Sequence, residues 1–356
     1  MTVPAQVPAG SADDPEQSAV LQTFPLAQQW QTLDPFLFCV HHLDAYPKAN
    51  EFMGPDAALH ARDIGMDFSG TDGWNMYHGS VVPGFPQHPH RGFETVTLVR
   101  RGLVDHSDSL GAAARFGGGD VQWLTAGAGV VHSEMFPLLD RNEPNPLELF
   151  QIWLNLPAAN KMSDPYFTML WAEDIPTVEV GTDTAVTVVA GALDGRRPPE
   201  PPPDSWASQP DSDLAIWVIS MGANGEWTLP AAGDDTVRVL YLFEGAGMAV
   251  DATPVVPRTG AVLRSDTEVT LRCLDGGAGA RSGTEALLLQ GRPIGDPVAQ
   301  YGPFVMNDKA GIQQAFEDYR RTGFGGWPWP TDDPVHGAER GRFARHVDGR
   351  VEEPTG

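Results

Sequence analysis

The chain has 356 residues, of which 41% are hydrophobic and 20% are charged, a composition typical of a folded globular protein. Its 47 acidic and 23 basic residues give a formal net charge of −24, which argues against direct nucleic-acid binding through a basic face. Two distant cysteines exclude a disulfide framework. Because the N-terminus lacks a signal-peptide pattern and no apolar run reaches the about 18 residues of a membrane span, we expect a cytoplasmic protein without membrane contact.

The sequence pattern of residues 1–300 predicts an N-terminal tail followed by two sets of strands. Residues 1–30 are rich in Pro, Ala, Ser and acidic residues, which predicts a disordered tail. Residues 31–184 contain strand patterns, among them LELFQIWLNLP, whose apolar residues on both faces indicate a strand buried on both sides. Residues 185–300 contain a second, similar set of short strands after a proline-rich loop. Two β-units in series suggest an internal duplication.

One helix is predicted near the C-terminus, in residues 301–322. Its apolar residues recur at helical spacing, namely Ile312, Ala315, Phe316 and Tyr319. Asn307 is the predicted N-cap, and Gly323 is expected to end the helix. Residues 323–356 are predicted to be irregular. The fold class is therefore all-β with one short C-terminal helix.

Four side chains of the first β-unit form a candidate metal site. Alternate residues of an extended segment face the same side, so His88 and His90 project together, and so do His132 and Glu134. If the two strands meet inside a barrel, three imidazoles and a carboxylate converge, a donor set that suits Fe, Mn, Ni, Cu or Zn. A six-coordinate metal with these ligands keeps two positions open for a substrate oxygen or O₂. The second unit cannot build this site, because no histidine lies between His132 and His336.

Two further polar residues are candidates for a supporting or substrate-binding role. Glu94 follows the HPH motif and is counted on the same face as His90, so residue alternation does not decide between Glu94 and Glu134 as the carboxylate ligand. Gln151 lies in an otherwise apolar strand, and a buried amide needs partners. It either faces the metal cavity, where it would hold a water or the substrate, or satisfies backbone groups. We interpret His42 as a structural residue.

The segments that carry these residues resemble two motifs of the cupin superfamily. HPHRGFETVTLVRRG is similar to the first cupin motif and GDVQWLTAGAGVVHSE to the second. Together with QIWLNLP and YGPFVMN, these segments make the sequence similar to the pirin family from about Phe38 to Arg321. Fewer of the matching residues lie in the second unit. The resemblance implies a bicupin, in which two antiparallel cupin barrels follow one another. Residues 31–184 would form the metal-binding barrel and residues 185–300 a barrel without a metal site.

The resemblance also implies a ligand set and two classes of function. The iron ligands of the family fall on His88, His90, His132 and Glu134, which leaves Glu94 as a supporting group that orients a histidine. Some pirins cleave flavonols such as quercetin by 2,3-dioxygenation, which implies an iron-dependent dioxygenase with Glu134 as the proton acceptor. Other divalent transition metals would also suit the site. Other pirins bind proteins, including transcription factors, so the alternative is an iron- and redox-responsive regulatory protein. We expect a monomer.

Overall fold

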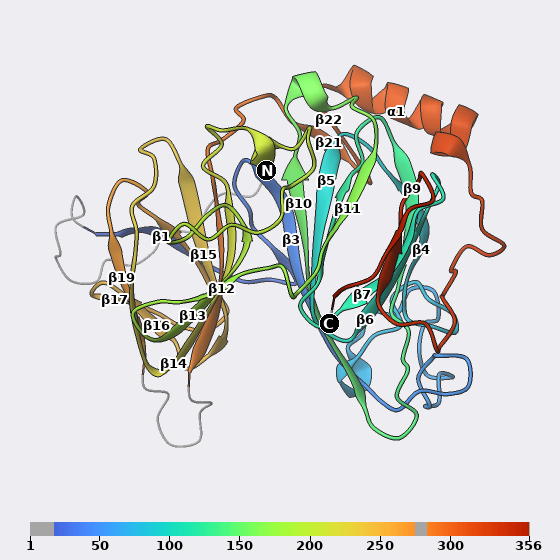
Figure 1. The fold of residues 1–356 in the computed structure, drawn as a ribbon, viewed down its shortest axis with the longest axis horizontal. Coiled ribbons are helices and arrows are strands. Elements are labelled where there is room, and N and C mark those ends of the chain that lie inside the picture. Colours follow the sequence, from blue (N-terminus) through green and yellow to red (C-terminus); the bar gives the residue numbers. More distant parts are fainter. Residues whose placement is uncertain (1–17, 275–282, 356) are drawn as a thin grey trace.

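The computed structural model describes residues 18–274 and 283–355, and in it two β-barrels lie side by side (Figure 1). All strand pairs within the two barrels are antiparallel. The predicted all-β class with two antiparallel barrels is therefore confirmed.

The first barrel consists of two six-stranded sheets that enclose one apolar core. One sheet, in the order β11-β8-β5-β10-β3-β2, contains β2 (Gln29–Trp30), β3 (Phe36–Tyr46), β5 (Phe93–Arg101), β8 (Val121–Thr125), β10 (Asn145–Asn155) and β11 (Tyr166–Leu170). The other, in the order β24-β23-β7-β6-β9-β4, contains β4 (Gly84–His90), β6 (Leu103–Asp108), β7 (Ala113–Gly117), β9 (Val130–Met135), β23 (Phe343–Arg345) and β24 (Val351–Glu352).

The second barrel is one ten-stranded sheet. Its main path runs β1-β18-β15-β20-β14-β19-β16-β17, and β13 joins β14 to β12. The strands are β1 (Val20–Pro25), β12 (Thr177–Glu179), β13 (Thr182–Ala190), β14 (Ala215–Leu229), β15 (Val237–Gly245), β16 (Met248–Val250), β17 (Thr253–Val255), β18 (Thr259–Leu263), β19 (Val269–Cys273) and β20 (Thr284–Gly291). The boundary predicted after residue 184 falls inside β13.

The two barrels share a hydrophobic interface that explains the apolar pattern of β10. Phe150 and Ile152 of β10 belong to a core cluster that also contains Tyr241 and Leu287 of the second barrel. Trp30 stacks on Tyr241 in this cluster, with 5.1 Å between ring centroids. The opposite face of β10 lies inside the first barrel. The strand is buried on both sides because each face packs against a different layer.

Both ends of the described chain differ from the predicted tails. Residues 1–17 lie outside the described residues, but β1 pairs with β18 and Trp30 is buried, so the predicted disorder is wrong for residues 20–30. Residues 323–356 are not irregular throughout, because β23 pairs with β7 and β24 pairs with β23. Pairing of these segments with open sheet edges satisfies backbone groups that would otherwise face solvent.

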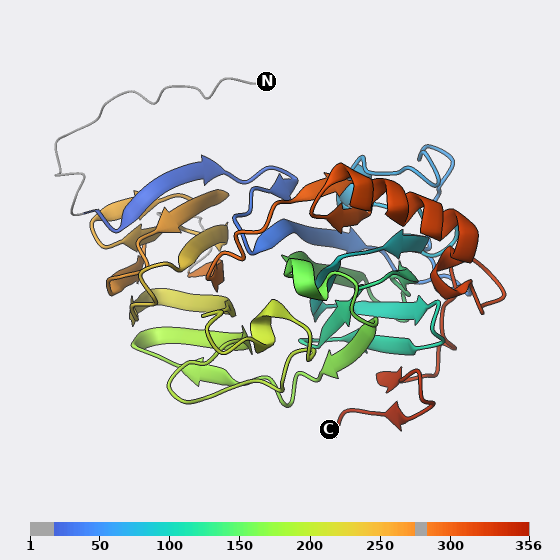
Figure 2. The same cartoon turned by 90° about the horizontal axis from the view of Figure 1, so that it is seen from above.

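The predicted C-terminal helix is present as α1 (Lys309–Thr322), which lies over the first barrel (Figure 2). A hairpin of β21 (Ala299–Tyr301) and β22 (Phe304–Met306) precedes it. The N-cap is Asp308 and not Asn307, because the Asp308 carboxylate accepts a hydrogen bond of 2.7 Å from Gly311 N. Short 3₁₀ turns are η1 (Thr71–Gly73), η2 (Ala158–Asn160), η3 (Trp206–Ser208) and η4 (Gly323–Gly325). In the described ranges, no helix combines the length and apolar character needed to cross a bilayer.

Candidate metal centre

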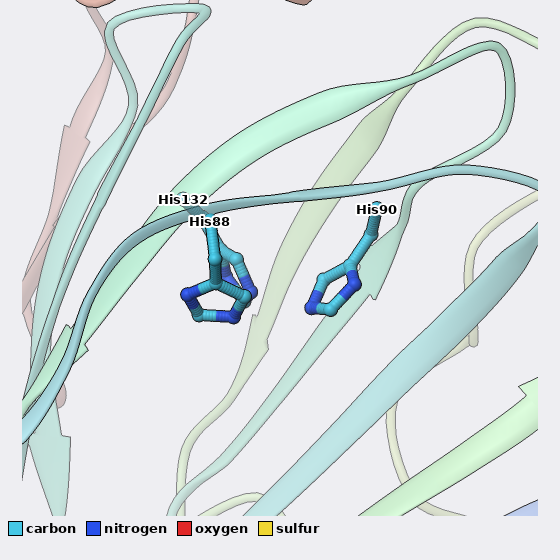
Figure 3. Close-up of side chains that lie close together, drawn as sticks. All are labelled: His88, His90 and His132. Carbon is cyan, nitrogen blue, oxygen red and sulfur yellow. The ribbon is translucent and has the colours of Figure 1, made fainter. Parts of the chain in front are cut away.

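Three histidines from neighbouring strands converge inside the first barrel (Figure 3). His88 and His90 project from β4, and His132 projects from β9, directly opposite His88 in the antiparallel pair. The ring centroids are 4.5 Å apart for His88 and His132, 4.8 Å for His88 and His90, and 4.9 Å for His90 and His132. One ring nitrogen of each histidine lies within 4.8 Å of the other two. The strand register thus brings together the two histidine-bearing motifs that the sequence singled out.

Three ring nitrogens of this histidine group have no hydrogen-bond partner among the described residues. Both nitrogens of His132 and Nδ1 of His90 are buried without a hydrogen bond to any residue that the structure describes, whereas His88 Nδ1 lies 2.8 Å from the carbonyl oxygen of Pro86. A buried polar atom without a partner costs about 1–3 kcal/mol. Burial lowers the pKa of His88 to about 4 and the pKa values of His90 and His132 well below the ordinary value. Neutral imidazoles with free lone pairs fit a metal ion.

Glu134 lies next to this histidine group, and its carboxylate lies against the side chains of Gln151 and Thr97. Its Oε2 is 3.8 Å from His132 Nε2 and accepts a hydrogen bond of 3.1 Å from Gln151 Nε2. The Thr97 hydroxyl lies 3.2 Å from Glu134 Oε1 and donates a shorter bond of 2.5 Å to Gln151 Oε1. Burial raises the pKa of Glu134. Of the two alternatives for Gln151, the structure shows the amide in the cavity, where it fixes Glu134.

The cavity that contains these groups has a volume of about 210 Å³ and mostly apolar walls. Its polar wall residues are His42, His88, His90, Thr97, Glu134 and Gln151, and its apolar wall residues are Phe38, Val40, Phe85, Phe136, Leu149 and Trp153. A cavity with aromatic walls and a few convergent polar groups is the usual form of a small-molecule site. The arrangement is suited to a flat, aromatic molecule with polar substituents.

Thr97 and His42 line the cavity, although the sequence analysis did not name Thr97 and interpreted His42 as a structural residue. Thr97 of β5 lines the cavity, and Val99 on the same face packs in the core of the first barrel. The chain turns just before β5 at Gly92, where φ is +83° and a Cβ atom would lie 1.9 Å from Val305 O. Because of this turn, the alternation of side chains between the two faces of β4 does not continue into β5. Counting on from His90 therefore assigns the residues of β5 to the wrong faces. Counting β5 afresh from the glycine would have identified Thr97.

Glu94 lies on the opposite face of β5 and does not orient a histidine. Its carboxylate accepts hydrogen bonds from Thr125 Oγ1 at 2.6 Å and from Ser205 Oγ at 2.5 Å. Val96 and Leu98, on the same face, pack in the core between the barrels. The predicted role of Glu94 beside the metal ligands is therefore wrong in this structure, for the same reason that Thr97 was missed.

Glu94 should make the stability of the protein fall as the pH rises. Burial raises its pKa to about 7 from an ordinary value of 4.5. The folded state then binds the proton more tightly than the unfolded state, so the stabilisation is complete below pH 4.5 and is lost as the pH rises through 7. The full effect is about 3 kcal/mol. The Glu94→Gln variant should lack this dependence, so the difference in unfolding free energy between variant and wild type should change between pH 4.5 and pH 8 in urea denaturation.

The exposed Glu226 provides a matched control, because Glu226→Gln removes an exposed ion pair with Arg272 and such pairs contribute little to the unfolding free energy. A difference between Glu94→Gln and wild type that stays constant over this pH range would show that Glu94 does not titrate there.

A larger cavity of about 400 Å³ lies at the junction of the two barrels and contains a second carboxylate cluster. Arg100 donates to Glu148 Oε1 at 2.5 Å and pairs with Glu285 Oε2 at 2.7 Å. Arg101 adds two bonds to Glu148 Oε2, at 2.7 and 2.8 Å. These arginines neutralise carboxylates from both barrels, so we interpret the cluster as a structural ion-pair network.

Sequence comparisons identify the family of the chain. Residues 17–154 match the family described as Pirin, and residues 216–325 match the Pirin C-terminal cupin domain. A Pseudomonas aeruginosa protein named "Putative quercetin 2,3-dioxygenase" is 37% identical over 241 residues, which cover 67% of this chain and 79% of that protein. A "Pirin-like protein" of Caulobacter vibrioides is 35% identical over 272 residues, which cover 76% and 90% of the two chains.

A solved structure agrees with these matches. The crystal structure of a quercetin 2,3-dioxygenase from Acinetobacter baumannii is similar with a TM-score of 0.67 at 27% identity, and the match covers 86% of this chain and 98% of that chain. The family matches, the relatives and the two cupin-type barrels lead to one conclusion: the chain belongs to the pirin family.

Proposed function

We propose that this protein is an iron-dependent dioxygenase that cleaves a flavonol-type substrate, with the iron held by His88, His90, His132 and Glu134. The observation that carries the proposal is the group of three neutral imidazoles with unpaired nitrogens, set in an aromatic cavity beside a carboxylate. Relatives and a structural neighbour that are named as quercetin 2,3-dioxygenases support the substrate class.

The side chains of the cavity would bind the substrate and handle its proton. When bound, the iron supplies the Lewis-acid and redox chemistry that amino-acid side chains lack. Phe38, Phe85 and Trp153 offer ring faces and edges to a flat substrate. Glu134 is the proton acceptor for an acidic hydroxyl, because burial raises its pKa and thereby makes its carboxylate a stronger base. Gln151 holds this carboxylate in place.

The proposal predicts that iron-loaded protein, prepared without oxygen and mixed with quercetin in air, bleaches the flavonol absorbance and releases carbon monoxide. Glu134→Gln should lower kcat by about 100-fold or more, because a positioned general base contributes about that much. Metal content is measured in parallel, since Glu134 is also a proposed ligand. Undiminished turnover in Glu134→Gln would remove Glu134 from the role of base, and no bleaching by fully loaded wild type would contradict the proposed activity.

The alternative, an iron- and redox-responsive regulatory protein that binds a protein partner, stays a prediction. The same experiment separates it from the enzyme: absence of bleaching, together with partner binding that changes with the iron oxidation state, would favour the regulator. The monomeric state and the cytoplasmic location also stay predictions.

A further inference from the structure

A chain of hydrogen bonds leads from the wall of the metal cavity into the protein. His42, which lines the cavity, places its Nδ1 2.8 Å from the hydroxyl oxygen of Tyr77. The Tyr77 hydroxyl donates a bond of 2.7 Å to Asp44 Oδ2. His42 and Asp44 are alternate residues of β3 and share one face, whereas Tyr77 comes from the long segment between β3 and β4.

When Asp44 is ionised, the hydrogens available to the two hydrogen bonds of Tyr77 determine which tautomer His42 adopts. Tyr77 has one hydroxyl hydrogen and gives it to Asp44, so the hydrogen between His42 and Tyr77 must come from His42 Nδ1. A neutral ring with its hydrogen on Nδ1 carries a lone pair on Nε2. Nε2 makes no hydrogen bond with the described residues, so its lone pair is free in a side chain that lines the cavity. Burial, with the charge of His41 as a smaller cause, lowers the pKa of His42 to about 4, which keeps the ring neutral.

The environment of Asp44 allows it to accept a proton near neutral pH. Asp44 is buried, and among the described residues its Oδ1 accepts bonds only from the backbone and side-chain nitrogens of Asn75, at 2.9 and 3.0 Å. The nearby guanidinium of Arg62 donates instead to Asp67 Oδ2 at 2.7 Å. Burial therefore raises the pKa of Asp44 to about 6, although Tyr77 and Asn75 donate to it and lower the pKa; the charge of Asp67 adds a smaller raising effect.

Tyr77 is held in place by a strained backbone. Its φ is +57°, in the left-handed region that an aromatic residue rarely adopts. Two backbone bonds of 2.9 Å to Asp67 fix this conformation. Strain of this kind costs about 1–3 kcal/mol and is concentrated at functional sites. The fold thus maintains the tyrosine between the histidine and the aspartate at an energetic cost.

We propose that His42, Tyr77 and Asp44 form a proton relay that removes a proton from a phenol or enol hydroxyl of the substrate. The substrate O–H bond breaks and its proton binds His42 Nε2. The Nδ1 proton passes to the Tyr77 oxygen, and the Tyr77 proton passes to Asp44 Oδ2. The substrate loses one proton, Asp44 gains one, and His42 stays neutral with its hydrogen moved to Nε2. The reverse sequence returns the proton to the product.

The relay depends on the proposed function in one respect only, namely that a substrate of this kind supplies the proton. Glu134 belongs to β9 and His42 to β3, and both line the same cavity. The two bases can therefore serve different hydroxyl groups of one polyhydroxylated substrate. In this arrangement His42 is a catalytic residue that touches the substrate, whereas Tyr77 and Asp44 act through it.

The relay can be tested without substrate by NMR of the full-length protein with ¹⁵N-labelled histidine. We expect the His42 signal, assigned by its absence in His42→Gln, to report hydrogen on Nδ1 at pH 8. On acidification through about pH 6 the hydrogen should move to Nε2 without formation of the imidazolium, because Asp44 takes up the proton. Tyr77→Phe and Asp44→Asn should abolish this switch. Tyr46→Phe is the matched control, since Tyr46 is a neighbouring buried tyrosine that donates to Asn75 O.

The second measurement is turnover of quercetin by iron-loaded variants. Tyr77→Phe should lower kcat by about 10- to 100-fold at unchanged metal content and change the acidic limb of the pH profile, and Tyr46→Phe should do neither. Hydrogen on Nε2 throughout the titration of wild type, or wild-type kcat and pH profile in Tyr77→Phe, would overturn the relay. Lack of turnover by wild type would refute the proposed function alone, because the NMR titration still decides the relay.

Discussion

Replacing His132 by alanine should abolish stoichiometric metal binding, with a loss of affinity for Fe²⁺ of at least about 100-fold. His132 contributes two buried nitrogens without partners in the described part of the chain and lies opposite His88 across β4 and β9. In wild type, metal at 1,000 times its Kd should raise the unfolding free energy by about 4 kcal/mol. The His132→Ala variant should gain almost nothing. Metal analysis and thermal unfolding with and without added metal measure both effects.

His88→Ala should behave like His132→Ala, because its ring belongs to the same group. The exposed His60 offers a matched control, and His60→Ala should bind metal like wild type. Full metal content in either cavity variant would overturn the proposed ligand set and, with it, the metal-dependent mechanism.

Replacing Arg115 by methionine should destabilise the protein by about 3–5 kcal/mol, because it leaves a buried carboxylate without its counter-charge. Arg115 and Asp105 form a buried ion pair with two bonds of 2.7 Å. The same guanidinium donates to the carbonyl oxygens of His336, Gly337 and Arg340, each at 2.8 Å. The variant should therefore also release the C-terminal segment, which limited proteolysis after residue 326 would detect.

Arg350 is a suitable control for this experiment. It forms an exposed ion pair with Glu352 in the same C-terminal segment, and such pairs contribute little to stability. Arg350→Met should unfold in urea like wild type. An unfolding free energy of Arg115→Met within about 1 kcal/mol of wild type would contradict the buried-charge argument.

The sequence alone was sufficient for the class of fold and for the three histidines that meet in the cavity. Two sets of short strand patterns and the doubly apolar pattern of β10 predicted two β-units in series, the resemblance to the pirin family implied antiparallel barrels, and both barrels are present. The two histidine-bearing motifs also pointed to His88, His90 and His132, because alternation within one strand is a local property of the backbone. Their separation by about forty residues did not hide them, since each pair was recognisable by itself.

Contacts between segments distant in sequence were decided by the tertiary structure alone. Gly92 resets the alternation between β4 and β5, which turns Glu94 toward Ser205 and brings Thr97 into the cavity. The chain ends look polar in sequence, yet β1 pairs with β18 and β23 pairs with β7, strands that lie far away in the chain. The hydrogen bonds that link His42, Tyr77 and Asp44 were likewise not predicted from the sequence. Local patterns reveal which face of a strand a residue occupies, whereas the partner on that face depends on how turns and barrels close, which is a property of the whole chain.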